Sequence, residues 1–247
     1  MMKVAAVYDI HGNLPALEAV LEEIDALEVN QIVVGGDVVL GPMSRECLDR
    51  LLSCKIPIQF IKGNCEIAVL EEMDKGYQGS LPQSVVEDIR WTARQLLPRH
   101  QKEMLNWPMT VTFRMNGLGK ILFCHATPEN ENENFTKLTP EEKLLPIFSD
   151  VNAEAVVCGH THMQFDRRIG TKRVINAGSV GMPFGKPGAY WLLIDSDINF
   201  RHVVYNARQA VTRVRNTTYP HAEQFAEGSI LNPPSEESML KLFSNAQ

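Results

Sequence analysis

Side chains of the kinds that bind metal ions follow short apolar runs at five places in the sequence. They comprise two carboxylates, four imidazoles and one carboxamide. Imidazole and oxygen ligands together suit first-row divalent metals such as Mn, Fe, Co, Ni and Zn. Seven ligands are too many for one tetrahedral zinc ion, whereas two ions that share one carboxylate would use all of them. The candidate ligands are Asp9, His11, Asp37, Asn64, His125, His160 and His162.

The first third of the sequence alternates apolar runs, over residues 3–8, 31–35 and 56–61, with segments of helical periodicity. The first such segment begins after Asn13, a suitable N-cap, and has Pro15 in its tolerant first turn. This alternation predicts a βαβαβ unit with parallel strands that are buried on both faces. In an open α/β sheet, ligands bind at the carboxyl ends of the strands, so we expect the seven residues to meet at that edge.

The second half of the sequence is dense in short apolar runs that are separated by turns. The expected strands span residues 109–114, 120–124, 155–158, 165–169, 173–175, 189–194 and 198–204. The polar segment 129–134 is expected to be a loop. No linker rich in Gly, Ser or Pro divides the sequence. We therefore predict a single domain over residues 1–247, with a helical insert at about 66–108 and a C-terminal tail from about 207 that is one helix followed by loosely held residues.

The composition limits the class of partner. The 247 residues include 24 Lys plus Arg and 30 Asp plus Glu, a formal net charge of −6, which disfavours a protein that coats long nucleic acid or an anionic membrane. No apolar stretch approaches the roughly 18 residues of a membrane span. The five cysteines are odd in number and show no C-x-x-C spacing, which predicts reduced thiols and a cytoplasmic location.

The ordered set of short motifs resembles the calcineurin-like metallophosphoesterases. The motifs are Asp9-x-His11-Gly12, Gly36-Asp37, Gly63-Asn64, His125 and Gly159-His160-x-His162. Segments 8–21 and 91–96 are similar to the larger bacterial and archaeal predicted phosphodiesterases of that superfamily. The resemblance covers about residues 3–205, and the set of motifs in this order is highly specific.

This resemblance implies an α/β fold, a four-layer αββα sandwich of two mixed sheets with a dinuclear metal site at the carboxyl ends of the strands. It implies that one ion is held by Asp9, His11 and His162. It implies that the other ion is held by Asn64, His125 and His160, and that Asp37 bridges the two. The implied cofactors are two divalent ions, Mn, Fe, Ni, Co or Zn, with Mn favoured.

The resemblance also implies a hydrolase that cleaves small phosphodiesters by attack of a hydroxide held between the two ions. Asn64, Cys65 and His125 are the expected catalytic residues. The expected partner is a small anionic phosphoester, which the ions attract despite the acidic surface. A dinucleotide polyphosphate hydrolase and a phosphomonoesterase remain alternatives, as does a scaffold without activity like the retromer subunit of this fold. The sequence does not decide whether the insert caps the site or forms the interface of a homo-oligomer.

Two positions depart from the pattern of the family. Cys65 stands where many members have a histidine, and a thiol is a poorer proton donor near neutral pH, so Cys65 is either catalytic or a packing residue. Phe184 stands where related sequences often have an arginine, with Lys186 as a candidate substitute. The remaining histidines, His100, His202 and His221, are expected at the surface.

Overall fold

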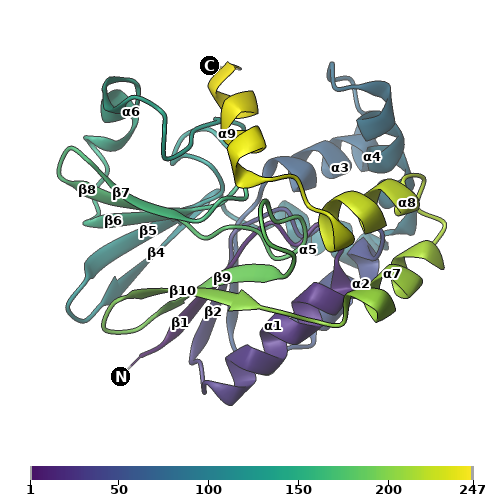
Figure 1. The fold of residues 1–247 in the computed structure, drawn as a ribbon, viewed down its shortest axis with the longest axis horizontal. Coiled ribbons are helices and arrows are strands. Elements are labelled where there is room, and N and C mark those ends of the chain that lie inside the picture. The colour runs from purple at the N-terminus through teal and green to yellow at the C-terminus, as the bar shows by residue number, and fades with distance from the viewer. Residues whose placement is uncertain (1, 246–247) are drawn as a thin grey trace.

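Two mixed sheets of five strands each pack face to face in the computed structural model, which describes residues 2–245 (Figure 1). The first sheet runs in the order β10 (Ile198–Val203), β9 (Ala189–Ile194), β1 (Val4–Val7), β2 (Gln31–Val34) and β3 (Ile58–Phe60). The second runs in the order β4 (Thr110–Met115), β5 (Gly119–Cys124), β6 (Ala155–Cys158), β8 (Lys172–Asn176) and β7 (Phe165–Ile169). All the strands expected from the sequence are present, and no end differs from the expected one by more than two residues.

Parallel strands occupy part of each sheet. In the first sheet β1, β2 and β3 are parallel, which confirms the predicted βαβαβ unit, whereas β9 and β10 are antiparallel to their neighbours. In the second sheet β5, β6 and β8 are parallel, and β4 and β7 close its edges in the antiparallel sense. The carboxyl ends of these parallel strands therefore form the rims from which the loops of a site can converge.

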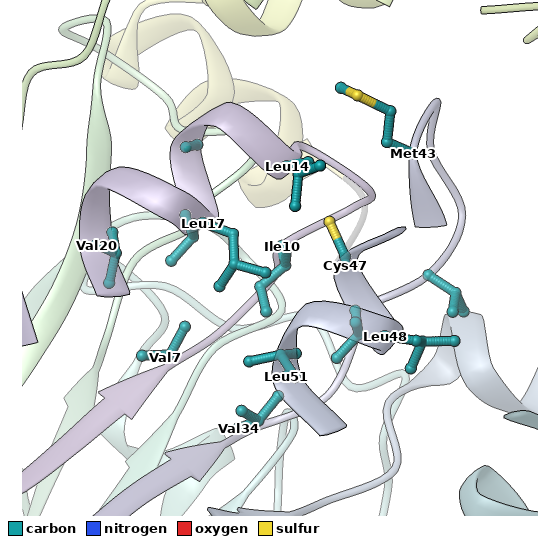
Figure 2. Close-up of a cluster of buried hydrophobic side chains, with 14 of the residues drawn as sticks. Val7, Ile10, Leu14, Leu17, Val20, Val34, Met43, Cys47, Leu48 and Leu51 are labelled. Atoms are coloured by element: carbon teal, nitrogen blue, oxygen red, sulfur yellow. The ribbon is translucent and has the colours of Figure 1, made fainter. Parts of the chain in front are cut away.

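Helices α1 (Leu14–Ala26) and α2 (Ser44–Leu52) cover the outer face of the first sheet. Figure 2 shows the cluster in which Val7 and Val34 of the strands meet Leu17 of α1 and Leu48 of α2. The side chain of Asn13 accepts the N–H of Ala16 at 3.3 Å, so the predicted N-cap of α1 is confirmed.

The strands of the first sheet are apolar on both faces because their alternate residues enter different cores. Val4 and Ala6 of β1 face the second sheet, where they join Phe123 and Leu192, while Ala5 and Val7 face the helices. This double burial is why β1 is an uninterrupted apolar run and not an alternating one.

Helix α6 (Glu141–Phe148) covers the outer face of the second sheet and completes the αββα sandwich. Its buried residues Leu144 and Phe148 pack on the sheet beside Phe135. This helix is not predicted from the sequence, because the helix is short and contains Pro146, a residue that usually breaks helices.

The insert consists of α3 (Asn64–Lys75), α4 (Gln83–Gln95) and α5 (Pro98–Leu105). It begins two residues earlier than expected, since Asn64 is already helical. Ile89 and Met104 join the core that α1 and α2 form, so the insert extends the helical layer. His100 is fully buried, with its Nε2 atom 2.8 Å from Asp49, and the expectation that it lies at the surface is wrong.

The segment from residue 207 is more ordered than a single helix with a loose end. It forms α7 (Ala207–Arg215), α8 (Ala222–Phe225), the π-helical turn η1 (Ala226–Leu231) and α9 (Glu236–Asn245), and Phe225 and Ile230 are buried. Residues 246–247 of the expected tail lie outside the described residues. No described helix is both long and apolar enough to cross a bilayer.

Candidate metal centre

All seven residues expected to bind metal lie together at the carboxyl ends of strands from both sheets. Asp9 and His11 follow β1, Asp37 follows β2 and Asn64 follows β3. His125 follows β5, and His160 and His162 follow β6. The fold thus brings five segments of chain to one place, as the sequence analysis expected.

The seven side chains form two groups that meet at Asp37. Ligand atoms of Asp9, His11 and His162 lie within 4.8 Å of one another, as do those of Asp37, His125 and His160. Asn64 joins the second group, since its Oδ1 atom is 2.9 Å from His125 Nε2. Asp37 Oδ2 is 3.5 Å from His125 Nε2 and 3.8 Å from His11 Nε2. A carboxylate in this position faces both groups.

The backbone at these residues is held in an unusual conformation. Five of the seven have a positive φ, which is 54° at Asp9, 45° at His11, 54° at Asp37, 67° at His160 and 59° at His162. Such a conformation costs a non-glycine residue about 1 kcal/mol or more, so it persists only where surrounding structure enforces it. Concentrated strain of this kind is typical of functional sites.

Several buried polar atoms of the cluster have no hydrogen-bond partner, namely Asp9 Oδ1, His11 Nδ1 and His160 Nε2. In addition, the Nε2 atoms of His11 and His162 face each other at 3.2 Å. Buried polar groups without partners are rare in proteins and call for a specific explanation. Carboxylate oxygens and imidazole nitrogens directed at a common centre fit first-row divalent ions.

Hydrogen bonds to backbone carbonyls orient two of the imidazoles. His125 Nδ1 donates to the carbonyl of Gly35 at 2.9 Å, and His162 Nδ1 donates to that of Met182 at 2.7 Å. With a proton fixed on Nδ1, Nε2 is the nitrogen of each ring that is directed into the cluster. This is the arrangement in which histidines usually bind metals.

The charged groups of the cluster lower the pKa of Asp37 and raise that of His125. Burial opposes the ionised form of Asp37, yet His125 and His11 hold the pKa of its carboxyl well below the usual range. Burial likewise opposes protonation of His125, but Asp37, Asp9 and the bond to Gly35 raise its pKa to about 10. Without ions, the cluster therefore contains an ionised Asp37 carboxylate next to a protonated His125 imidazole.

Two glycines allow the loops to approach the carboxylates closely. A Cβ atom on Gly63 would lie 2.2 Å from Asp37 Oδ1, and one on Gly159 would lie 2.5 Å from Asp9 Oδ2. Contacts this short do not occur, so any other residue at either position would displace a carboxylate of the cluster.

Glu66 is a residue of the site that the sequence analysis missed. Its fully buried carboxylate accepts the backbone N–H groups of Asp37, Val38 and Gly63 at 2.8 Å each, and that of Val39 at 3.2 Å. Burial and the neighbouring charge of Asp37 raise the pKa of Glu66 to about 7. A signal was present, since a glutamate three residues after the N-cap of a helix is typical of a capping box.

Cys65 is buried beside the carboxylate that lies between the two groups. Its Sγ atom is 3.0 Å from Asp37 Oδ2, and its backbone N–H donates to Asp37 Oδ1 at 2.9 Å. Burial and the charge of Asp37 raise the pKa of the thiol well above its usual value. The thiol is therefore protonated near neutral pH and donates a hydrogen bond to Asp37.

Phe184 lies against His162, with ring centroids 5.3 Å apart and ring planes inclined by 26°. Lys186, the candidate substitute for an arginine, is exposed two positions further on. An aromatic ring thus forms the edge of the site next to His162, at a position that departs from the pattern of the family.

Comparisons with known proteins find relatives along most of the chain. At the sequence level the chain is 26% identical over 244 residues to the protein MJ0912 of Methanocaldococcus jannaschii, covering 88% of this chain and 93% of that one. It is 25% identical over 212 residues to the phosphodiesterase YfcE of Escherichia coli, covering 80% of this chain and 90% of that one.

Two solved structures share the fold. The protein PH1004 of Pyrococcus horikoshii superposes with a TM-score of 0.81 at 20% identity, covering 95% of this chain and 100% of that one. A metallophosphoesterase of Sphaerobacter thermophilus superposes with a TM-score of 0.73 at 23% identity, covering 92% and 99%. A family model described as the calcineurin-like phosphoesterase superfamily domain matches residues 2–197, and the chain belongs to that superfamily.

Proposed function

We propose that this protein is a metal-dependent hydrolase of small phosphodiesters that uses two divalent ions, with manganese favoured. The observation that carries the proposal is the pair of ligand groups with Asp37 Oδ2 between them, 3.8 Å from His11 of one group and 3.5 Å from His125 of the other. The name of the E. coli relative, a phosphodiesterase, supports the same class of substrate. The complete set of ligands argues against a scaffold that has lost activity.

Each side chain of the cluster has a role in this proposal. Asp9, His11 and His162 would hold one ion, Asn64, His125 and His160 would hold the other, and Asp37 would be shared by both. Bound ions would supply Lewis acidity and a water activated near neutral pH. Asn64 is a neutral ligand, so two acids face two divalent ions and the site stays positive toward an anionic phosphate.

The chain's own contacts prepare the site for this task. The carbonyls of Gly35 and Met182 hold His125 and His162 with Nε2 directed inward. Cys65 donates to Asp37, which limits the freedom of the bridging carboxylate. In this role Cys65 tunes a ligand, whereas proton donation to a leaving group would need a more acidic group. Good leaving groups are therefore the preferred substrates.

The thiols support a cytoplasmic location. All five cysteines are unpaired, and four of them are buried. Free thiols in this number are typical of a reducing compartment.

The proposal is tested by reconstituting metal-free protein with Mn, Fe, Co, Ni or Zn and assaying aryl phosphodiesters, aryl phosphomonoesters and dinucleotide polyphosphates. We expect the diesters to be hydrolysed fastest. Asp37→Asn and His160→Ala should each reduce kcat at least about 100-fold. The matched control Asp150→Asn changes an exposed carboxylate outside the cluster and should have no effect. Hydrolysis of monoesters alone, or full activity of either cluster variant, would refute the proposal.

A further inference from the structure

The C-terminal helix α9 lies beside the candidate metal centre. In Figure 1 it stands at the top of the view, between the α6 side and the α3 side of the molecule. Phe243 of α9 is 6.4 Å from Phe184, measured between ring centroids, and Phe184 stacks on the candidate ligand His162. A continuous row of rings therefore runs from α9 to the cluster.

Contacts at the start of α9 attach it to loops on both sides of this row. The carbonyl of Pro234 accepts the N–H of Gly185 at 2.8 Å, in the loop that carries Phe184 into β9. Glu236 forms an ion pair with Lys137, in the loop between β5 and α6. Residues 234–236 thus connect the loop that precedes β9 of the first sheet with the loop that follows β5 of the second.

Most side chains of the candidate site are buried, and His162 is among the few that remain partly exposed. The side chains of Asp9 and His125 are 0% exposed, that of Asp37 is 3% exposed and that of His162 is 10% exposed. Phe184 and Phe243 are half-buried, and Phe184 lies next to the partly exposed His162. A group attached to a phosphate at the cluster and directed past His162 meets this aromatic wall.

We propose that Phe243 and Phe184 determine the specificity of the enzyme, by forming an aromatic wall that limits the size of the non-leaving substituent of a phosphodiester. This inference rests on the proposed function. Phe243 acts through its ring contact with Phe184. The start of α9 is attached by one backbone hydrogen bond and one exposed ion pair, and each of these interactions is individually weak. We therefore expect loss of the Phe243 ring to loosen the wall.

The test compares two diesters that release the same p-nitrophenolate and differ only in the second substituent. These are bis(p-nitrophenyl) phosphate, which carries a bulky aryl group, and methyl p-nitrophenyl phosphate, which carries a methyl group. In Phe243→Ala we expect the ratio of kcat/KM for the aryl diester to that for the methyl diester to rise at least about threefold over the wild-type ratio. Leu242→Ala, an exposed residue of the same helix, is the matched control and should leave the ratio unchanged.

Hydrogen exchange gives a readout that does not need activity. Exchange of the amides in the 182–188 loop should quicken in Phe243→Ala and not in Leu242→Ala, because Phe243 supports that loop through Phe184. An unchanged or lower substrate ratio, or unchanged exchange, would overturn the proposed wall. If neither diester is hydrolysed by the metal-loaded wild type, the proposed function fails instead, and the exchange comparison still tests the contact with α9.

Discussion

The carboxylate of Glu66 accepts the backbone N–H of Asp37 at 2.8 Å, so the candidate bridging residue is held by an acid that belongs to neither ligand group. The same carboxylate holds Gly63, the residue before Asn64, also at 2.8 Å. One side chain therefore fixes the spacing between the loop after β2 and the loop after β3. The positions of Asp37 and Asn64 relative to each other depend on this spacing.

The substitution Glu66→Gln should weaken metal binding. It would place an amide nitrogen against backbone N–H groups that now donate to a carboxylate oxygen, so at least one of these bonds would be lost. We expect the affinity for Mn²⁺ to fall about 10- to 100-fold, the range seen when partners of metal ligands are removed. Isothermal titration of metal-free protein measures this change.

The control for that experiment is Glu71→Gln on the same helix. Glu71 lies 3.7 Å from Lys75 in an ion pair between residues on the surface of α3, and it does not contact the cluster loops in any of the bonds described. Its replacement should leave the affinity unchanged. Equal losses in both variants would show that the charge of α3, and not the backbone contacts of Glu66, governs metal binding.

Metal binding should strengthen as the pH rises. Despite burial, Asp37 and Asp9 hold the pKa of His125 up at about 10, so below that pH the ion-free site carries a proton that an ion must displace. His160, whose pKa burial and the charge of His125 lower to about 4, is already neutral and adds no such cost. We expect the affinity to rise about tenfold per pH unit for each displaced proton between about pH 6 and pH 9.

Calorimetry in two buffers of different ionisation enthalpy counts the protons that are released. Release of at least one proton per chain at about pH 7 is the expected result. A pH-independent affinity with no release would show that His125 is neutral in the ion-free protein.

The thiols should differ in their reactivity. Cys65 is 4% exposed, and burial beside Asp37 raises the pKa of its thiol, so little thiolate is present to react. Cys54 is half-buried and has no buried acid beside it among the contacts described. Iodoacetamide labelling at about pH 8, followed by peptide mass spectrometry, should modify Cys54 well before Cys65. Faster labelling of Cys65 would show an activated thiolate and would contradict the protonated thiol that donates to Asp37.

The sequence predicted those parts of the fold in which local signals and tertiary structure agree. Asn13 and Pro15 mark the start of α1, and the apolar residues that follow have helical spacing, so the helix could be predicted with its cap. The meeting of the seven candidate ligands could be predicted because each follows an apolar strand, and the carboxyl ends of parallel strands meet at one edge. The second sheet and its arrangement against the first came from resemblance, since pairing between distant strands leaves no local signal.

The parts that were missed depend on packing or on irregular backbone. Helix α6 contains Pro146 and is stabilised by burial of Phe148 on the second sheet. His100 looked like a surface residue in a polar segment, but it is buried because Asp49, far away in the sequence, supplies a partner. The π-helical turn over Ala226–Leu231 follows no 3.6-residue period. In each case a contact from elsewhere in the chain decides the local conformation.

The outer layer over the second sheet should be sensitive to the loss of a single ring. Phe148 of α6 is fully buried and packs edge to face on Phe135, with ring centroids 5.5 Å apart. Phe148→Ala removes this packing and leaves a cavity, so we expect the free energy of unfolding to fall by about 3–5 kcal/mol. Leu145→Ala on the same helix, where the leucine is 38% exposed, should cost about 1 kcal/mol or less. Urea unfolding followed by circular dichroism measures both, and equal losses would mean that α6 contributes through its helix content and not through the buried face.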